Sequence, residues 1–579
     1  MDWTPAPGPE PPPVAPAEPE AATPADPPRP RLARRLLVAS LTFVVVAGLT
    51  AGGVTAFRFF RGAGDQLLSL APDDTFAYAT VYLDPPGSQK LAVNSLLSRF
   101  PNAASPSQLD ASVNRVLDQA FASSGLTHND IRPWLGGQVS VVVSSAPASS
   151  TSHVPQVAAL VSSSDDGKAR AALKKFEASS EGQQFAWSTQ THDGVSLDVG
   201  QRKETGELTV FAIVNGTFVF ASSATYANEI IDTAHGSHAS LSSTSDYSTA
   251  LSQVPTDKLA LFYVDVPRLS RLLSSASNGA ASVPFGHFPS SLLQLSGYHG
   301  LAFALSAQAD GLAFDGVADY DRSKLSPGSR AAADLAPSVN SALRFVPDHA
   351  FGLYAVNGLP QVVRSVLDSF KSLGVGSAGI DQTVNRYLGH LTGDAALEVD
   401  RLPGQTVPAG ALIVATDSDA SAHQLLDNAL HTIGCAAGLC GPSSSATQTY
   451  RGTDITTLTL SPALTSQGVA PSWAVSGHMA IVASNPQEMR SVLDAAAGTN
   501  VTTSPRFAGV IHEADIANNA MLYLDLASIE TAVRAILPDQ ARSVYDSQVA
   551  QYLDHFTTLV LTTSNSGDRS TMRSFLRVQ

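Results

Sequence analysis

The sequence is poor in cysteine and in positive charge, and both shortages exclude classes of function. Two cysteines among 579 residues are too few for a disulfide framework or a cysteine-based zinc cluster. The 35 Lys and Arg residues are outnumbered by 50 Asp and Glu residues, so the formal net charge is −15. Binding to nucleic acid, and adhesion to anionic lipid headgroups, both need clustered basic residues. We therefore expect no nucleic-acid partner, and solubility is the simplest purpose of the acidity.

The motifs of several common enzyme chemistries are also missing. The sequence contains no HExxH zinc motif, no GxSxG nucleophile elbow and no GxxxxGK[ST] phosphate loop. Its 14 histidines are scattered along the chain. A serine–histidine–aspartate triad cannot be inferred from distant residues alone, because any chain of this length offers such combinations. We expect no enzymatic activity, no cofactor and no metal.

The longest apolar run is 36–57, whose 22 residues carry no charge. At about 1.5 Å per residue, such a helix crosses the roughly 30 Å hydrocarbon core of a bilayer. Four arginines precede it within 29–35 and two follow within 58–61, which predicts a cytoplasmic N-terminus and an extracytoplasmic remainder. A cleaved signal peptide is the alternative, since 54–56 (VTA) resembles a cleavage site. Signal cores are shorter, about 7–15 residues, so we predict an uncleaved single-pass anchor in the cell membrane.

The tail and the span have simple expected features. Twelve of the first 30 residues are proline, so we predict that 1–35 is a disordered cytoplasmic tail. Within the span, Gly48 and Gly52 form a GxxxG pair, a pattern that lets two membrane helices pack closely. Glycine is also common in membrane helices without that role, so the oligomeric state stays open.

The part after the span, about 520 residues, is longer than one hydrophobic core usually supports. Five blocks of its first half recur in the same order in its second half, at offsets of about 253 to 275 residues. The first-half blocks are 72–81 (PDDTFAYATV), 136–143 (GGQVSVVV), 157–166 (VAALVSSSDD), 215–223 (NGTFVFASS) and 259–266 (LALFYVDV). Their counterparts are 347–356 (PDHAFGLYAV), 392–399 (TGDAALEV), 410–419 (GALIVATDSD), 476–484 (SGHMAIVAS) and 520–526 (AMLYLDL). The preserved order favours a tandem duplication, with module 1 at 66–325 and module 2 at 335–579.

Within each module, strand patterns alternate with short helical patterns. Runs such as 209–220 and 473–482 are rich in β-branched and aromatic residues, as strands are. Each is followed by a polar turn and a segment of helical periodicity, 226–234 or 487–497. We therefore predict an α+β fold for the part after the span, with a mixed but mostly antiparallel sheet and helices packed on it.

Several aspartates stand where the predicted strands end. Asp166 and Asp419 occupy expected helix N-caps, although the acidic residues beside them also permit a cation site. Three Tyr-x-Asp motifs stand at predicted strand ends, at 82–84, 263–265 and 523–525. A catalytic interpretation would make the aspartate a base. Because residues i and i+2 share a face of a strand, we prefer a structural role in which tyrosine packs and aspartate caps the next helix.

The two cysteines, Cys435 and Cys440, lie close together in the segment HTIGCAAGLCGPSSS. Outside the membrane the environment is oxidising, and four intervening residues allow a small ring to close, so we predict a local disulfide. Two free thiols are the alternative. A metal site is less favoured, because His431 is the only other plausible ligand nearby and zinc takes four.

The opening of the outer part, LAPDDTFAYATVYLDP, is the most distinctive segment. The residues that make it so are Leu70, Ala71, Pro72, Asp74, Thr75, Tyr78, Leu83, Asp84 and Pro85. This segment resembles a bacterial, mainly actinobacterial, domain-of-unknown-function family whose members have a similar LAPxDTxxYxxxxLDP opening behind one membrane helix. The resemblance implies the anchor and the topology, and it implies no catalytic or binding residues.

Together these features predict a membrane-anchored extracytoplasmic protein that is a non-enzymatic binding module of the cell envelope, with a protein or glycan partner. One alternative is an ectodomain that binds lipid or another hydrophobic ligand. The other is an extracytoplasmic hydrolase whose site the motifs do not reveal.

Overall fold

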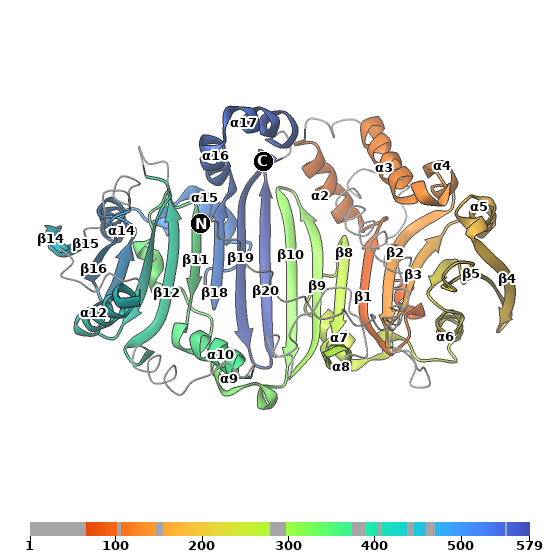
Figure 1. The fold of residues 1–579 in the computed structure, drawn as a ribbon, viewed down its shortest axis with the longest axis horizontal. Coiled ribbons are helices and arrows are strands. Elements are labelled where there is room, and N and C mark those ends of the chain that lie inside the picture. Colours follow the sequence, from red (N-terminus) through yellow and green to blue (C-terminus); the bar gives the residue numbers. More distant parts are fainter. Residues whose placement is uncertain are drawn as a thin grey trace, which may run out of the picture.

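The computed structural model describes residues 65–100, 106–145, 155–277, 297–372, 388–402, 408–436, 445–458, 469–550 and 553–579 (Figure 1). They form a mixed fold of helices and one β-sheet of 20 strands. Every pair of neighbouring strands among these residues is antiparallel. The structure confirms the predicted combination of helices with a mostly antiparallel sheet.

Each half of the chain contributes ten strands. The first ten are β1 (Thr75–Tyr82), β2 (Leu135–Ser144), β3 (Gln156–Ser163), β4 (Phe185–His192), β5 (Val195–Arg202), β6 (Leu208–Val214), β7 (Thr217–Ala221), β8 (Ala260–Asp265), β9 (Tyr298–Gln308) and β10 (Gly311–Tyr320). The second ten are β11 (Gly352–Val356), β12 (Leu391–Asp400), β13 (Ala409–Thr416), β14 (Ser445–Tyr450), β15 (Thr453–Leu458), β16 (Ser472–Ser476), β17 (Met479–Ala483), β18 (Ala520–Asp525), β19 (Phe556–Ser566) and β20 (Arg569–Val578).

The helices lie mostly between strands that are neighbours in the sequence. In the first half they are α2 (Gly87–Leu97), α3 (Pro106–Phe121), α4 (His128–Ile131), α5 (Asp166–Ala178), α6 (Ala224–Ala234), α7 (Ser245–Leu251) and α8 (Val266–Ser277). In the second half they are α9 (Pro327–Ala333), α10 (Leu359–Ser372), α12 (Asp419–Ala436), α14 (Pro486–Ala497), α15 (Pro505–Ile511), α16 (Leu526–Ile536) and α17 (Asp539–Tyr545), followed by the π-helical turn η10 (Asp546–Ala550).

The same strand order occurs twice across the sheet. It is β4-β5-β6-β7-β3-β2-β1-β8-β9-β10 in the first half and β14-β15-β16-β17-β13-β12-β11-β18-β19-β20 in the second. The halves join where β10 pairs with β20, the last strand of each set. There Asp315 lies opposite Arg573, and each is the fifth residue of its strand. An approximate two-fold axis perpendicular to the sheet therefore passes between these two residues.

Figure 1 makes this relation visible. Strands β14 and β4 lie at opposite ends of the sheet, while α17 and α8 lie above and below its middle strands. A repeat of one supersecondary unit produces such an arrangement. The module limits 66–325 and 335–579 themselves stay a prediction from the sequence.

One face of the sheet, which we call the packed face, carries the two largest cores. In the first half, Ile230 of α6 and Tyr247 of α7 pack with Tyr78 of β1, and the two tyrosine rings are 6.4 Å apart. In the second half, Val492 of α14 and Phe507 of α15 belong to the corresponding core. These helices cover the same strands in both halves, so the packed face is closed along most of the sheet.

The opposite face, which we call the open face, is covered only in places. Helices α3, α4 and α5 pack over outer strands of the first half, and α12 packs over outer strands of the second. Nearer the middle, α2 packs on Leu305 and Leu312, and α10 packs near Val356 and Ala395. Figure 1 shows β9, β10, β19 and β20 with no helix drawn across them.

The structure corrects two local details of the sequence analysis. The runs 209–220 and 473–482 each form two strands joined by a two-residue turn, at 215–216 and 477–478, and all four turn residues have positive φ. Such tight hairpins interrupt a strand without breaking its apolar pattern. Helix N-caps also lie one residue earlier than predicted. Asp165 and Ser418 accept the capping hydrogen bonds, and Asp166 and Asp419 are the first helical residues.

The structural interpretation of the Tyr-x-Asp motifs fits at two of the three positions. Tyr263 and Tyr523 are buried, while Asp265 and Asp525 accept backbone hydrogen bonds from the first turns of α8 and α16 at 2.9 and 3.1 Å. Asp84 differs, because two prolines follow it before α2 begins, and its carboxylate instead pairs with a lysine of α2 at 2.5 Å.

None of the helices formed by the described residues combines the length and the apolarity that crossing a bilayer requires. The predicted tail 1–35, the predicted span 36–57 and its Gly48–Gly52 pair all lie outside the described residues.

Candidate functional site

A row of apolar side chains crosses the open face at right angles to the strands. We call this row the apolar belt, and its members are Phe262 of β8, Phe303 of β9, Phe314 of β10, Leu561 of β19, Leu522 of β18, Tyr354 of β11, Leu397 of β12 and Leu412 of β13. Strand β20 contributes Ser574, which lies opposite both Phe314 and Leu561. With neighbouring strands about 4.8 Å apart, the nine strands from β8 to β13 span about 38 Å.

The strand register places the members of the belt side by side. In the second half, Tyr354 lies opposite Leu522 on one side and Leu397 on the other, and Leu397 lies opposite Leu412. Directly opposite residues of antiparallel strands have Cβ atoms about 4.5–5.5 Å apart, so their side chains touch. The row is therefore continuous and is set by backbone pairing.

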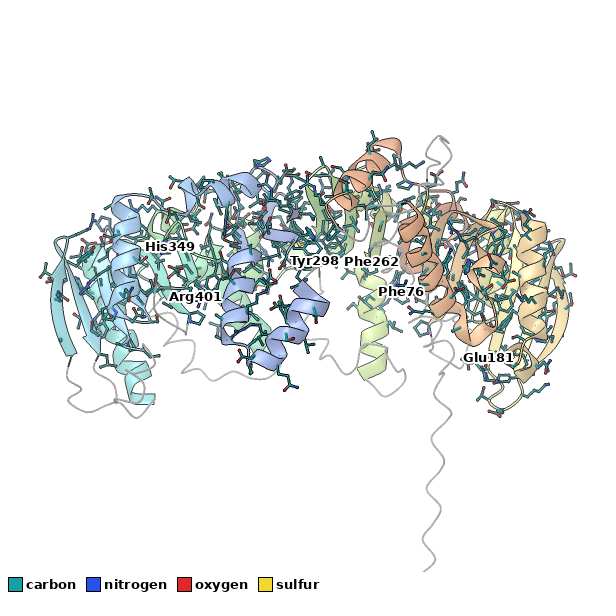
Figure 2. The ribbon with its side chains drawn as sticks, turned by 90° about the horizontal axis from the view of Figure 1, so that it is seen from above. Phe76, Glu181, Phe262, Tyr298, His349 and Arg401 are labelled. Atoms are coloured by element: carbon teal, nitrogen blue, oxygen red, sulfur yellow. The ribbon has the colours of Figure 1, made fainter. Side chains whose placement is uncertain are left out.

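The first-half end of the belt is aromatic. Phe262 lies opposite Phe303, with ring centroids 6.4 Å apart, and Phe303 stacks on Phe314 at 5.4 Å with an interplanar angle of 4°. Phe262 lies near the middle of the length of the molecule, as Figure 2 shows. These three rings thus stand beside the approximate two-fold axis, where the two halves join.

Five belt side chains are exposed although they are large and apolar. The exposed fractions are 41% for Phe262, 40% for Phe314, 47% for Tyr354, 49% for Leu397 and 44% for Leu412. Burying a side chain of this kind is worth about 1.5–3 kcal/mol, so a row of them left in water costs stability. Contiguous exposed apolar surface on a folded protein marks a site of interaction.

Two helices border the belt. Helix α2 packs on the open face toward one end of the central strands, and α10 packs on it toward the other end. Figure 1 shows α2 in the upper part of the molecule and α10 in the lower part. The belt therefore runs across a floor of paired strands between two helical margins.

The two halves differ at the outer part of the belt. By strand order and register, Ala79 and Val141 of the first half correspond to Tyr354 and Leu397. Ala79 and Val141 are only 9% and 6% exposed, whereas their larger counterparts are about half exposed. The second half alone thus presents bulky apolar side chains at these positions, which is a difference that the common fold does not require.

A second unusual site is a pair of buried acids on the packed face. Glu398 of β12 and Glu488 of α14 are both 0% exposed, and none of their four carboxyl oxygens has a hydrogen-bond partner among the described residues. Asp400, two residues further along β12, is 1% exposed and pairs with His349 at 2.8 Å. The pairing with Asp400 raises the pKa of His349 to about 9.

Burial dominates the protonation of the two glutamates. Burial, helped by the nearby Asp400 carboxylate, raises the pKa of Glu488 to about 7. Burial and the facing Glu488 carboxyl hold the pKa of Glu398 well above its ordinary value. Two carboxylates this close in an apolar core cannot both be charged without a large cost, so the pair holds at least one proton at neutral pH.

The first half has a pair of hydroxyl groups at the corresponding place. Val142 and Ser144 take the positions of Glu398 and Asp400 on the equivalent strand, and Tyr226 takes the position of Glu488 in the first turn of α6. The Tyr226 hydroxyl is 2.9 Å from the Ser144 hydroxyl. The acidic pair is therefore specific to the second half, and the sequence analysis did not single it out.

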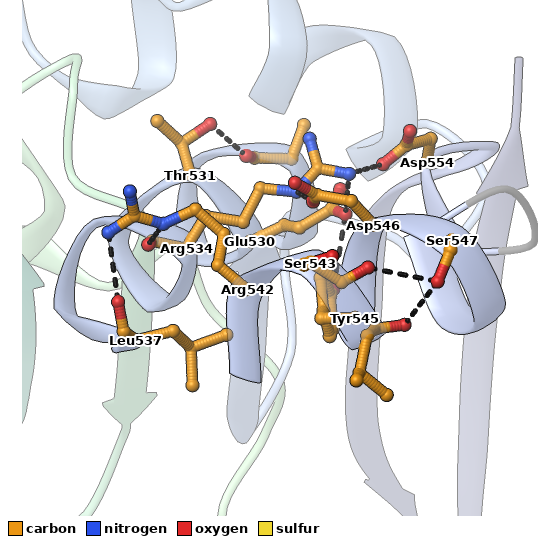
Figure 3. Close-up of polar contacts among 12 residues, drawn as sticks. Glu530, Thr531, Arg534, Leu537, Arg542, Ser543, Tyr545, Asp546, Ser547 and Asp554 are labelled. Carbon is orange, nitrogen blue, oxygen red and sulfur yellow. Dashed lines mark hydrogen bonds and ion pairs between the residues drawn. The ribbon is translucent and has the colours of Figure 1, made fainter. Parts of the chain in front are cut away.

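A helical hairpin above the middle strands forms a third feature (Figure 3). Arg534 of α16 is its centre, because its guanidinium pairs with Glu530 at 3.0 Å, Asp546 at 3.2 Å and Asp554 at 2.9 Å. It also stacks 5.5 Å from the ring of Tyr545. The outer surface of the hairpin leaves Val533, Ile536, Val544, Val549 and Leu553 exposed.

A shallow polar hollow lies where β9, β10, β19 and β20 reach one edge. Its lining includes His299, Asp319, Ser566 and Arg569. Arg569 donates a hydrogen bond to Asp319 at 2.7 Å, but among the described residues no hydrogen bond joins His299 to Ser566 or to an aspartate. A nucleophile needs a base within hydrogen-bond reach, so this hollow does not assemble a hydrolase site.

The site residues predicted from the sequence lie away from these features or outside the described residues. Cys435 lies in the last turn of α12 and Cys440 lies outside the described residues, so the disulfide stays a prediction. No group of His, Cys, Asp and Glu among the described residues is arranged to hold a metal ion. The segment 374–379 (GVGSAG), which lies outside the described residues, has GxGxxG spacing. It follows helix α10 where that motif requires a strand, so it lacks the needed context.

Comparison with known proteins shows the family of the chain but gives it no function. The model of the family described as "Protein of unknown function (DUF3352)" matches residues 39–574. No curated protein matches the sequence. Solved structures that resemble it include crystal forms IV and III of TP0453, at 8% and 10% identity and a TM-score of 0.21. They cover 44% and 45% of this chain, and 79% and 82% of their own. A likeness at this score carries no argument, whereas the family match is nearly complete, and the chain belongs to that family of unknown function.

Proposed function

We propose that this member of the DUF3352 family is a membrane-tethered, non-enzymatic binding protein of the cell envelope, and that it binds its partner on the apolar belt. The single observation that carries the proposal is the belt itself, in which five large apolar side chains are 40–49% exposed along one sheet face. Exposed apolar surface of this kind is costly to keep unless it is covered by a partner for part of the time.

The chemistry of the belt favours an apolar partner over a glycan. Its members carry one hydroxyl group, that of Tyr354, and no charge, and Ser574 adds a second hydroxyl beside them. A glycan would need several convergent hydrogen-bonding side chains in addition to a stacking ring. An apolar ligand or an apolar protein surface needs none, so both remain partners that the belt suits.

The tether and its orientation rest on the sequence. The charge-free run 36–57 has the length of a membrane span, and the arginine bias puts the described fold on the outer side. We further propose that the fold arose by tandem duplication, and that its second half then acquired the bulky belt residues Tyr354, Leu397 and Leu412. The equal strand order of the two halves supports the duplication. The smaller residues at the equivalent first-half positions support a later gain of bulky belt residues in the second half.

Topology is tested with single cysteines in a chain that carries C435S and C440S. Ser188→Cys on the exposed strand β4 and Ala6→Cys in the tail are labelled in intact cells with a membrane-impermeant maleimide. We expect labelling at 188 in intact cells and at 6 only after lysis. The reverse pattern would place the fold inside the cell and refute the proposed location.

Binding is tested with a photoreactive phenylalanine analogue at Leu397, introduced into the full chain in living cells. Leu208, which is 39% exposed on β6 and lies off the belt, is the matched control position. We expect a discrete adduct, lipid or protein, at 397 and none at 208. If the two positions gave equal amounts of adduct, or none, the belt would not be the binding surface.

A further inference from the structure

We infer that the partner on the apolar belt is the acyl chain of a membrane phospholipid, which lies along the belt at right angles to the strands. This inference rests on the proposed function and goes beyond it by naming the ligand. It commits to phospholipid as the source of the acyl chain, and a free fatty acid, a protein surface and an empty belt are outcomes of the test below.

The shape of the belt matches a chain molecule. It is continuous through directly opposed residues, from Leu561 through Leu522 and Tyr354 to Leu412. Its length of about 38 Å is more than twice the roughly 15 Å occupied by the acyl chains of one leaflet, which is half of the 30 Å hydrocarbon core. Each half of the belt is therefore long enough for an extended acyl chain.

The chemistry of the belt disfavours a peptide. Every belt residue lies in a strand that has paired neighbours on both sides, so its backbone groups are used in the sheet. An extended peptide that lay across these strands would bury its own amide groups without partners, at a cost of about 1–3 kcal/mol for each group. An acyl chain has no such groups, and covering the belt with it takes the exposed belt side chains out of water.

The position of the fold in the chain supplies the ligand. Seven residues, 58–64, separate the predicted span from Asp65, the first described residue. Fully extended, they reach at most about 25 Å. The start of the fold, which lies on the packed-face side of the sheet, is therefore held within about 25 Å of the bilayer surface, where phospholipid is the most abundant source of acyl chains. The acidic chain does not need to attract the headgroup, because the belt recognises the apolar part of the lipid.

The test uses the full chain reconstituted in nanodiscs that contain phosphatidylglycerol with a diazirine in one acyl chain. After illumination, adducts are mapped by mass spectrometry. We expect adducts on β11, β12 and β13, in addition to those on the span itself. Leu397→Asp is expected to lower the belt adducts about tenfold, a change equivalent to roughly 1.4 kcal/mol. Leu208→Asp, at a similarly exposed apolar position off the belt, is expected to leave them unchanged.

A second arm and a folding control make the result decisive. In the second arm the same diazirine is carried by a free fatty acid at the same mole fraction, and labelling only in that arm would overturn the phospholipid as ligand. Adducts confined to the span, or equal in the wild type and Leu397→Asp, would overturn the inference.

Tyr354→Ser, a milder change on the neighbouring strand, is expected to lower labelling as well, and far-ultraviolet circular dichroism checks that both variants fold. A protein adduct in cells at position 397 without lipid labelling here would leave the proposed function standing and refute this inference alone.

Discussion

At the scale of single residues, the buried acidic pair is the clearest departure from what a stable core needs. Glu398 and Glu488 face each other in the core beside Asp400, while the first half uses a tyrosine–serine hydrogen bond at the same place. A buried unpaired acid costs stability, and it stays in place by binding a proton. This acidic pair therefore makes the stability of the second half depend on pH.

This pair predicts how stability depends on pH. The pKa of Glu488 is about 7 in the folded protein and near 4.5 when unfolded, so the folded state binds more protons between these values. The stability that this proton contributes is complete below about pH 4.5 and is lost as pH rises through about 7, a loss of roughly 3 kcal/mol over the window. Urea unfolding at several pH values measures it.

Glu488→Gln is the matched variant for that measurement. It keeps the shape of the side chain and removes its titration, so we expect a smaller fall in the free energy of unfolding between pH 5 and 8 than in the wild type. Glu513→Gln, at an acid that pairs with His512 near the surface, serves as control and should follow the wild type. A wild-type stability that rises between pH 5 and 8, with no effect of Glu488→Gln, would contradict the assignment.

At the scale of elements, the helical hairpin depends on one side chain. Arg534 neutralises the carboxylates of Glu530, Asp546 and Asp554, which come from three different turns of the hairpin. Exposed ion pairs are each worth little, about 0–1 kcal/mol, but this cation is shared by three acids that repel one another without it. The hairpin also buries none of the residues of α16, so it has little apolar contact to replace the network.

Arg534→Ala is therefore expected to open the hairpin locally. Hydrogen exchange measured by mass spectrometry should rise across 526–554, while exchange in β18 and β19 and the overall unfolding midpoint change little. Arg534→Lys keeps the charge but loses the planar fork, so its effect should be intermediate. Lys168→Ala removes a single exposed ion pair and should leave exchange unchanged. Unaltered exchange in Arg534→Ala would show that packing, and not this network, holds the hairpin.

At the scale of the whole molecule, the seam between β10 and β20 makes one sheet out of two halves. Gly311, at the first register position of the seam, has no room for a side chain. A Cβ there would overlap the Phe575 ring and lie 2.5 Å from the carbonyl oxygen of Leu576. We expect Gly311→Ala to destabilise the protein by about 1–3 kcal/mol or more in urea unfolding.

Gly87→Ala is the control for that variant, because a Cβ at Gly87 meets nothing within 4 Å. We expect a change below about 1 kcal/mol at this first position of α2. If both variants unfolded at the same urea concentration as the wild type, the close approach of the strands at the seam would be wrong.

Local features of this fold can be predicted from the sequence, and long-range features cannot. The roles of Asp265 and Asp525 follow from spacing within one strand and the next helix, and the structure bears them out. The belt depends on the register of nine strands, whose positions in the row lie between residues 262 and 574, and no local pattern encodes that register.

The acidic pair was missed for a similar reason, although a signal was present. Glu398 and Glu488 are distant in the sequence and meet only because α14 packs on β13, β16 and β17, beside β12. Yet in 396–400 (ALEVD), Glu398 is two residues after Ala396 and therefore shares its core-facing side of the strand. The corresponding residue of the first half is Val142. An acid at a core-facing strand position whose counterpart in the other half is a valine is a pattern that a comparison of the two halves reveals.

The central claim is that the apolar belt contacts lipid acyl chains, and tryptophan fluorescence tests it most directly. Leu397→Trp and Leu208→Trp are compared in the full chain in vesicles whose lipids carry bromine on their acyl chains, against unbrominated vesicles. The account predicts that the added tryptophan at 397 emits at shorter wavelength and is quenched by the brominated lipid, while that at 208 is neither shifted nor quenched. Equal emission and no quenching at both positions would contradict it.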